Sequence, residues 1–305
     1  MTNLVSNMSY SSQGHQGRLA VSPEVAGPAT DGLERSCRIL ADGIRTGPTA
    51  LGIERIEASF RGNGFAPHRH DTYALGLTLS GVQTFHYRGE SRFSQPGNII
   101  VLHPDELHDG AAGTEDGLRY RMLYVAPELI RQAGGETDVS LPFVATPVFS
   151  DPDFARALSE ALTDIEANPD VLAFDDVLAR IAAGLQRHAG MPAQRSEASA
   201  RTAVDRATAY LREHSEQTVT SQDLEALTGL DRYTLARQFR RLTGTSPHRY
   251  LVMRRLESAR RAMLSGAPLA EAAMEAGFAD QSHFTRHFKK SYGLTPGRWQ
   301  ELIRV

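Results

Sequence analysis

The stretch Phe239-Arg-Arg-Leu-Thr-Gly-Thr-Ser-Pro-His-Arg-Tyr250 has a second copy in this chain of 305 residues. The copy reads Phe288-Lys-Lys-Ser-Tyr-Gly-Leu-Thr-Pro-Gly-Arg-Trp299, so the paired phenylalanines, glycines, prolines and terminal aromatics are all 49 residues apart. A period of this length is typical of a duplicated supersecondary unit. The sequence therefore predicts two copies of one small helical motif in its C-terminal third.

Each copy has the pattern of two helices joined by a turn that contains glycine. In the first copy, a short helix over 221–227 is followed by Gly229 and by a second helix over 231–243, whose first residue is an aspartate placed to cap it. The second copy repeats this order over 269–292. The pattern is typical of a helix-turn-helix, and a long helix over 246–264 is expected to fix the distance between the two units.

Positive charge is concentrated in the same part of the chain. Residues 201–305 contain 17 Lys and Arg against 11 Asp and Glu, whereas residues 1–200 contain 16 against 25. A single amphipathic helix with basic residues is usually just a solvated face. Two copies with base-competent residues at matching positions favour DNA binding instead, because arginine and glutamine can each form bidentate hydrogen bonds with a base.

The connecting helix is expected to act as a rigid spacer. Consecutive major grooves on one face of DNA lie roughly 34–36 Å apart, a distance that such a spacer suits. Its apolar positions can serve as core, and its remaining arginines are predicted to be spare: Arg249, Arg254, Arg255, Arg260 and Arg261.

Residues from about 200 to 302 resemble the DNA-binding domain of the AraC/XylS family of transcriptional regulators. Two motifs carry the resemblance: Leu235-Ala-Arg-Gln-Phe-Arg-Arg-Leu-Thr-Gly-Thr-Ser-Pro-His-Arg-Tyr250 and Ala276-Gly-Phe-Ala-Asp-Gln-Ser-His-Phe-Thr-Arg-His-Phe-Lys-Lys-Ser-Tyr-Gly-Leu-Thr-Pro296. The second is close to the family's signature. The resemblance implies that the two units enter adjacent major grooves of double-stranded DNA.

Individual contacts follow from this resemblance. Base contacts are implied at Tyr233, Ala236, Arg237, Gln281, Ser282, His283 and Arg286. Arg237 and Arg286 are predicted to be the principal readers, and Ala236 offers only an apolar contact. Phosphate contacts, which position a protein without specifying sequence, are expected at Arg240, Arg241, Lys289 and Lys290.

The N-terminal part has a sequence pattern typical of β-strands. Between Leu51 and about Val125, alternating apolar residues are interrupted by turns that contain glycine, which predicts an all-β barrel or jelly roll. From Asp151 the apolar residues recur at helical spacing, and Pro169 divides them into a helical hairpin.

The predicted fold is therefore multidomain, with an N-terminal all-β barrel, a helical hairpin and a C-terminal all-α domain. The predicted segments are a disordered arm over 1–30, an effector-sensing barrel over 31–150, the hairpin over 151–188, a linker over 189–200 and the DNA-binding domain over 201–305. The single cysteine, Cys37, excludes an internal disulfide. Because no apolar run approaches the length of a membrane span, we expect a cytoplasmic protein.

Two stretches of the barrel resemble the cupin motifs. Gly62, followed after five residues by His68-Arg-His70, is similar to the first motif, and Pro96-Gly-Asn-Ile-Ile-Val-Leu-His-Pro-Asp-Glu-Leu-His108 is similar to the second. With the C-terminal match, they resemble the AraC-type sensor domain. The glutamate that follows the His-x-His of metal-binding cupins is absent, and His103 and Asp105 replace the proline and glycine usual in the second motif.

Three interpretations of the barrel histidines follow. In the first, His68, His70 and His108 hold a metal, as in a catalytic cupin. In the second, which we favour, they line a pocket for a small polar effector, and no metal or other cofactor is bound. The effector-binding residues are then His68, His70, Tyr73, His108, Tyr120 and Met122. In the third, the histidines are purely structural.

The predicted function is that of a sequence-specific DNA-binding transcriptional regulator controlled by a small-molecule effector. The hairpin either packs against its own barrel or also forms a homodimer interface, for which the candidate stripe is Phe174, Leu178, Ile181 and Leu185. The alternative from another class is a metal-dependent cupin enzyme with an incidental DNA-binding tail. A third possibility is a constitutive regulator with an empty barrel.

Overall fold

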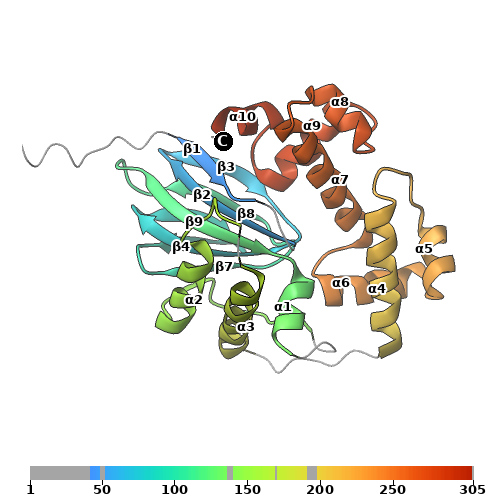
Figure 1. Ribbon diagram of the computed structural model, residues 1–305, viewed down its shortest axis with the longest axis horizontal. Helices are drawn as coiled ribbons and strands as arrows, with labels where there is room; N and C mark the ends of the chain where they lie inside the picture. The colour runs from blue at the N-terminus through green and yellow to red at the C-terminus, as the bar shows by residue number, and fades with distance from the viewer. Residues whose placement is uncertain (1–41, 49–51, 136–139, 169, 191–197, 304–305) are drawn as a thin grey trace, which may run out of the picture. The chain divides into compact units, whose positions relative to one another are not determined.

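The computed structural model describes residues 42–48, 52–135, 140–168, 170–190 and 198–303 (Figure 1). All of them belong to one unit, which begins at residue 39. The predicted arm over 1–30, Cys37 and most of the predicted linker lie outside the described residues.

The N-terminal part contains two antiparallel sheets, which confirms the predicted jelly-roll class. The larger sheet has the strand order β1 (Gly43–Thr46), β2 (Ile53–Phe60), β9 (Leu118–Val125), β4 (Tyr73–Ser80), β7 (Ile99–Leu102) and β10 (Val148–Phe149). The smaller sheet has the order β3 (Asn63–His68), β8 (His108–Ala112), β5 (Gln83–Tyr87) and β6 (Glu90–Ser94). Non-consecutive neighbours within both sheets mean that the chain crosses repeatedly from one sheet to the other.

The larger sheet is buried on both faces. On β4, Tyr73, Leu75 and Leu77 pack into a core with three helices, whereas Ala74 belongs to the core between the two sheets. The three helices are α1 (Pro127–Ala133), α2 (Pro152–Leu162) and α3 (Val171–His188), and Figure 1 shows them along one face of this sheet. β4 therefore reads as a nearly continuous apolar run.

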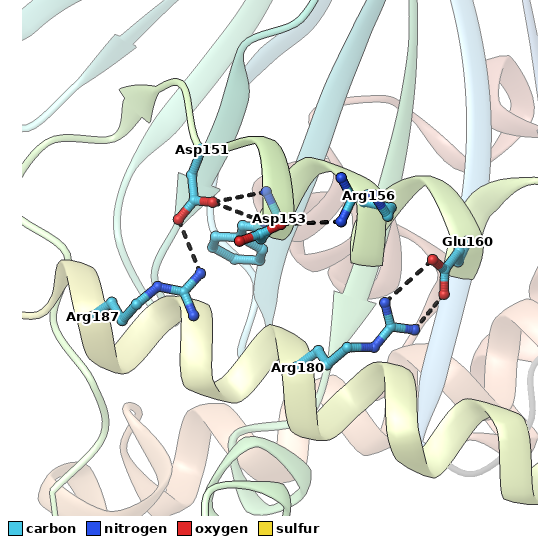
Figure 2. Close-up of polar contacts among 7 residues, drawn as sticks. Asp151, Asp153, Arg156, Glu160, Arg180 and Arg187 are labelled. Atoms are coloured by element: carbon cyan, nitrogen blue, oxygen red, sulfur yellow. Dashed lines mark hydrogen bonds and ion pairs between the residues drawn. The ribbon is translucent and has the colours of Figure 1, made fainter.

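The α2–α3 hairpin is held together at two places by ion pairs, one near each end of α2 (Figure 2). Asp151 caps α2 by accepting hydrogen bonds from its first backbone N–H groups, and it also pairs with Arg187 at 3.0 Å. Hydrogen bonds from the backbone of Phe154 and from His188 hold the pKa of Asp151 below its usual range. Farther along, Arg180 makes a two-pronged contact with Glu160. These contacts fix α3 against α2.

The apolar stripe of α3 lies inside the chain. Its four residues, predicted as a candidate dimer interface, join the core formed with the larger sheet: Phe174, Leu178, Ile181 and Leu185. Each is at most 5% exposed, so this stripe packs against its own barrel and is not free to face a second copy. The candidate interface was wrong because helical spacing identifies an apolar face but not what covers it.

The C-terminal part is all helical, as predicted. Its helices are α4 (Ala198–Glu213), α5 (Ser221–Thr228), α6 (Arg232–Thr243), α7 (Pro247–Leu264), α8 (Leu269–Glu275), α9 (Gln281–Tyr292) and α10 (Pro296–Leu302). Because α4 begins at Ala198, the last residues of the predicted linker are helical. The predicted caps are present: Asp231 and Asp280 accept backbone hydrogen bonds at the starts of α6 and α9, and Gly244 and Gly293 end them in the left-handed conformation.

Two hydrophobic cores lie in this part, one for each helix-turn-helix unit. The first contains Phe239 of α6, and the second contains Phe284 and Phe288 of α9. Helix α7 contributes to both, with Leu251 in the first core and Leu256 in the second. The two units are therefore joined by one shared, packed helix, as the sequence predicts.

Candidate DNA-binding surface and sensor site

The recognition helix of the first unit, α6, keeps its predicted base-contacting face open. Asp231 accepts hydrogen bonds from the backbone N–H groups of Tyr233 and Thr234, which fixes the start of the helix. Tyr233 is 71% exposed, and the exposed Arg237 donates a hydrogen bond to Thr234 Oγ1 at 2.9 Å. Ala236 is half-buried. The first two turns of α6 thus present two large polar side chains to solvent.

The recognition helix of the second unit, α9, presents three of its four predicted base contacts. Gln281, Ser282 and Arg286 are exposed. His283 is half-buried: its ring centre lies 4.6 Å from that of His287, and its Nδ1 has no hydrogen-bond partner among the described residues. His283 is therefore less accessible than the other three.

The four predicted phosphate contacts lie in the C-terminal halves of α6 and α9. Arg240, Lys289 and Lys290 are exposed, and Arg241 is half-buried. All four lie in the last turn of their helix, where a cation is also stabilised by the helix dipole. The structure thus leaves base-competent and phosphate-competent groups together on the surface of each recognition helix.

Three arginines of α7 pair with carboxylates of the barrel, so the prediction that they are spare was wrong. The closest nitrogen–oxygen distances are 2.7, 2.6 and 2.5 Å for Arg249–Asp105, Arg254–Asp71 and Arg260–Glu54. Arg255 instead donates to the backbone carbonyl groups of Ser215 and Gln217 within the helical part. The side of α7 that carries the three paired arginines is therefore docked on the barrel.

These ion pairs are largely removed from water. Burial alone would lower the pKa of Arg254, but the carboxylates of Asp71 and Glu257 more than offset this and raise it. For Arg249, burial dominates over the attraction of Asp105 and lowers the pKa. Both guanidinium groups remain charged at neutral pH. Since an unpaired buried charge is costly, separating α7 from the barrel requires water to replace these contacts.

The carboxylate of Asp105 reaches α7 from an unusual backbone conformation. Asp105 has a φ of 61°, in the left-handed region, at the position where the second cupin motif usually has glycine. Aspartate tolerates this region better than most residues. The Asp105 N–H donates to the carbonyl of His70 at 2.7 Å, and Arg69 donates to the Asp105 carbonyl at 3.2 Å. This turn is therefore fixed against the segment that carries Asp71.

The C-terminal ends of both recognition helices also pack on the barrel. The N–H of Ala66 on β3 donates to the carbonyl of Gly293 at 3.1 Å, and a Cβ atom on Gly293 would lie 2.7 Å from the Ala66 oxygen. At the end of α6, a Cβ atom on Gly244 would lie 2.6 Å from Pro104. The close approach thus depends on glycine, in addition to its left-handed conformation.

The three histidines predicted as a site lie together beneath the end of α9. The ring centres of His68 and His70 lie 4.3 and 4.7 Å from that of His108. Each Nδ1 lies 2.9–3.0 Å from a backbone carbonyl oxygen, those of Ala66, Thr72 and Glu106. A carbonyl only accepts, so each Nδ1 carries the proton and each Nε2 is unprotonated.

Burial keeps these histidines neutral. Loss of solvent, together with the neighbouring histidine, lowers the pKa of His70 and of His108 to about 3. The pKa of His68 is also well below its ordinary value for the same reasons. The Nε2 of His70 is buried and has no hydrogen-bond partner among the described residues. No group of three His, Cys, Asp or Glu side chains within the described ranges is arranged to hold a metal ion.

The six predicted effector residues are not all on one face. Tyr120 and Met122 line the core between the sheets, and His70 reaches this core through Tyr124, whose ring centre lies 5.2 Å away. Tyr73 lies on the opposite face of the larger sheet, among the helices, where its hydroxyl donates to the carbonyl of Pro142. Tyr73 is therefore separated from the other candidates.

Side chains from both sheets pack in the core between them. A cavity of about 10 Å³, lined in part by Phe60, Gln83 and Tyr120, is large enough for about one water molecule. Leu302 of α10 is buried in the same core, and Ile303 pairs with Ile44 of β1. A larger ligand between the sheets would therefore displace packed side chains, including some from the helical part.

Two family models match the regions just described. A model of the AraC-like ligand binding domain matches residues 50–182, and a model of a helix-turn-helix domain matches residues 224–302. The first range contains the histidine cluster, and the second contains both recognition helices. The chain belongs to the AraC family of transcriptional regulators. It combines the family's ligand-binding domain with a helix-turn-helix DNA-binding domain.

Two HTH-type transcriptional regulators and one solved structure resemble this regulator along most of its length. It is 27% identical over 228 residues to an uncharacterized HTH-type transcriptional regulator, YbfI of Bacillus subtilis (strain 168), covering 72% of this chain and 81% of YbfI. It is 24% identical to the HTH-type transcriptional activator RhaS of Klebsiella pneumoniae (strain 342), covering 79% and 89%. The structure of ToxT from Vibrio cholerae has the same fold, with a TM-score of 0.62 at 12% identity over 84% of this chain and all of ToxT.

Sequence reasoning missed the residues that join the two parts of this AraC-family regulator. Glu54, Asp71 and Asp105 are scattered through the barrel sequence, and their partners lie 144 or more residues away. One feature of the sequence could have indicated these contacts: α7 carries five arginines, which is more than its role as a connecting helix explains. No spacing rule relates them to single acidic residues on distant strands.

Proposed function

We propose that this AraC-family regulator reads a two-part DNA site through α6 and α9 and that a small molecule bound by the barrel controls how the helical part is held. The base contacts are proposed to be made by Tyr233, Ala236, Arg237, Gln281, Ser282, His283 and Arg286. Arg240, Arg241, Lys289 and Lys290 are proposed to contact phosphates.

The observation that carries the proposal is the division of the helical part into two kinds of surface. The recognition helices expose their polar and basic residues, whereas α7 and the ends of α6 and α9 contact the barrel. The same glycine that ends α9, Gly293, touches His68 of the histidine cluster: a Cβ atom there would lie 2.9 Å from His68 Nδ1. A change at the histidines would therefore be transmitted directly to a recognition helix.

The effector is proposed to act at His68, His70 and His108, together with Tyr120 and Met122. It must bind the docked and the altered arrangement with different affinities, because only differential binding shifts the population. Because the cavity between the sheets holds only about one water molecule, an effector that binds there would have to displace side chains, including some from the helical part. This supports a mechanism in which effector binding and a change in the docking of the helical part on the barrel occur together. Among proteins of the same fold, one ToxT structure is that of the unsaturated fatty acid bound form. The barrel is proposed to sense rather than to catalyse, in keeping with relatives that are transcriptional regulators.

The regulator is further proposed to act as a homodimer. Since the buried stripe of α3 is not available, the proposal rests on the exposed apolar residues at the start of that helix, Val171 and Leu172, which are 57% and 81% exposed. Sedimentation of the unaltered protein and of Leu172→Glu would test this. A monomer in both cases removes the proposal.

Selection of binding sites from a pool of random duplex DNA tests the central proposal. The expected result is a motif with two conserved parts one helical turn apart, protected together in a footprint. Binding that shows no sequence preference, or a motif with one part only, would contradict it. Titration of candidate effectors against the selected site then tests the coupling to the barrel.

A further inference from the structure

A hollow of about 650 Å³ lies on the outer face of the smaller sheet. It is lined by residues from all four strands of that sheet: 64–67, 84–86, Ser91, Phe93 and 109–111. On β5, Phe85 and Tyr87 face the core between the sheets, so the side chains of Thr84 and His86 face the other way. None of the proposed effector residues lines this hollow.

Polar side chains form a row across three strands in the hollow. His86 lies between Asp109 of β8 and Ser91 of β6, its cross-strand partner. The backbone N–H of His86 donates to Asp109 Oδ1 at 2.6 Å, and its Nδ1 lies 3.0 Å from Asp109 Oδ2. A carboxylate only accepts, so Nδ1 donates the hydrogen bond, and in the neutral ring Nε2 is left as an acceptor. The ring is thus held with one acceptor nitrogen available.

Apolar groups form a second, parallel row. Phe93 of β6 pairs with Thr84 of β5, which pairs with Ala111 of β8. Phe93 is 61% exposed, and Pro67 adds an apolar wall from β3. A phenylalanine on a strand usually buries most of its large surface. Here its ring lies open beside the polar row.

We infer that this hollow binds a small neutral molecule with a ring-sized apolar body and one O–H or N–H donor. The ring packs on Phe93, and the donor reaches Nε2 of His86. The hollow has the size of a small-molecule site, which typically measures about 300–1,000 Å³. Its lining contains the Asp109 carboxylate but neither lysine nor arginine, which disfavours an anion. This goes beyond the proposed function, because the site is separate from the histidine cluster and faces away from the interior.

Phenol and its methyl ether, anisole, are a matched pair of probes. They share the ring, but only phenol has the donor. In spectra that report the histidine ring nitrogens of the full chain, phenol is expected to shift His86 saturably. Anisole is expected to bind about fivefold more weakly, because one hydrogen bond is lost. Equal affinities for the two probes, or shifts confined to His68 and His108, would overturn the inference.

Variants on the exposed face separate the two rows. His86→Ala and Phe93→Ala are each expected to weaken phenol binding at least fivefold. The control variants His248→Ala and Phe143→Ala, at another exposed histidine and another exposed phenylalanine, are expected to leave it unchanged. The same loss in the controls, or none in His86→Ala, would refute the assignment.

Two further measurements keep the outcomes distinct. The affinity of His86→Ala and Phe93→Ala for the selected DNA site is expected to stay within twofold of the unaltered protein, so failure of the small-molecule site and failure of DNA binding are told apart. Sedimentation of Phe93→Ala tests whether a second copy of the chain, rather than a small molecule, covers this face. If this variant dissociates a dimer of the unaltered protein, and phenol does not bind that dimer, the face is an interface between copies and the inference falls.

Discussion

Arg254 of α7 lies 2.6 Å from the carboxylate of Asp71 in the barrel, although 183 residues separate them in the chain. Asp71 is 4% exposed, so neither partner can turn to water without moving the domains. The helix that joins the two DNA-reading units is thus also the helix that joins them to the sensor.

Removal of Arg254 is expected to loosen this docking. Arg254→Ala leaves Asp71 buried without its partner, which destabilises the docked arrangement by about 3–5 kcal/mol. Hydrogen exchange of α7 and of residues 66–71 is the measurement, with Arg261→Ala, an exposed arginine of the same helix, as the control. A double-mutant cycle with Asp71→Asn isolates the pair. Equal exchange in both arginine variants would contradict the role of the ion pair.

Gly293 offers a sharper test of the contact between α9 and the barrel. Gly293→Ala and Gly229→Ala both place alanine in the left-handed region, which costs about 1–2 kcal/mol. Only Gly293→Ala also brings Cβ to 2.7 Å from the Ala66 oxygen, because nothing lies within 4 Å of a Cβ at Gly229. Exchange of the Ala66 N–H is therefore expected to rise in Gly293→Ala alone. Similar exchange in both variants would show that the close approach does not matter.

Arg237 is expected to carry sequence specificity. Arg237→Ala should cost about 1–3 kcal/mol in binding and relax the preference at one base pair of the selected site. Fluorescence anisotropy with the site and with single-base variants measures this. If the loss is the same on random DNA, Arg237 does not read a base.

Arg240 is expected to contribute affinity without specificity. Arg240→Ala should weaken binding to all sequences and reduce the dependence of the binding constant on salt by about one counterion. Titrations at several salt concentrations on selected and random DNA measure the slope. An unchanged slope, or a loss on the selected site alone, would assign Arg240 a different contact.

The buried histidines are expected to make stability depend on pH. The pKa of His108 is lowered to about 3 in the folded protein, whereas an unfolded histidine titrates near 6.5. Between these values the unfolded state binds more protons, so stability falls as pH falls from about 6.5 towards 3. Each such histidine costs about 1 kcal/mol at pH 5.5 relative to pH 7.5.

His108→Asn retains a side-chain N–H donor but does not titrate. Urea unfolding at pH 7.5 and 5.5 is expected to show a smaller loss of stability for His108→Asn than for the unaltered protein. The exposed His248 provides the control variant His248→Asn. If both variants lose as much as the unaltered protein, the cluster is not the source of the pH dependence.

The sequence was informative where a pattern is local. The duplicated motif predicts the helices, and Asp231, Gly244, Asp280 and Gly293 mark their ends because capping depends on residues within one turn. The proximity of His68, His70 and His108 was also expected from the two cupin-like motifs.

The sequence was uninformative where both faces of an element are covered. Because six successive residues of β4 are buried, its alternation does not say which of them face the space between the sheets; Tyr73, predicted to bind the effector, lies on the face that the helices cover. The apolar stripe of α3 was likewise ambiguous between its own barrel and a second copy. The partners of Arg249, Arg254 and Arg260 depend on how the barrel and the helical part pack against each other. No periodic pattern in the sequence of either part reveals this contact.

Because α7 contributes side chains to both helical cores, a displacement of α7 by the barrel is expected to move both recognition helices. A change in the contacts of Arg249, Arg254 or Arg260 with the barrel would move α7 as a whole, together with α6 and α9. The two recognition helices are then expected to bind or leave their DNA grooves together. The effect of the effector on DNA binding is therefore expected to be all-or-none, with no state in which only one of the two helices binds.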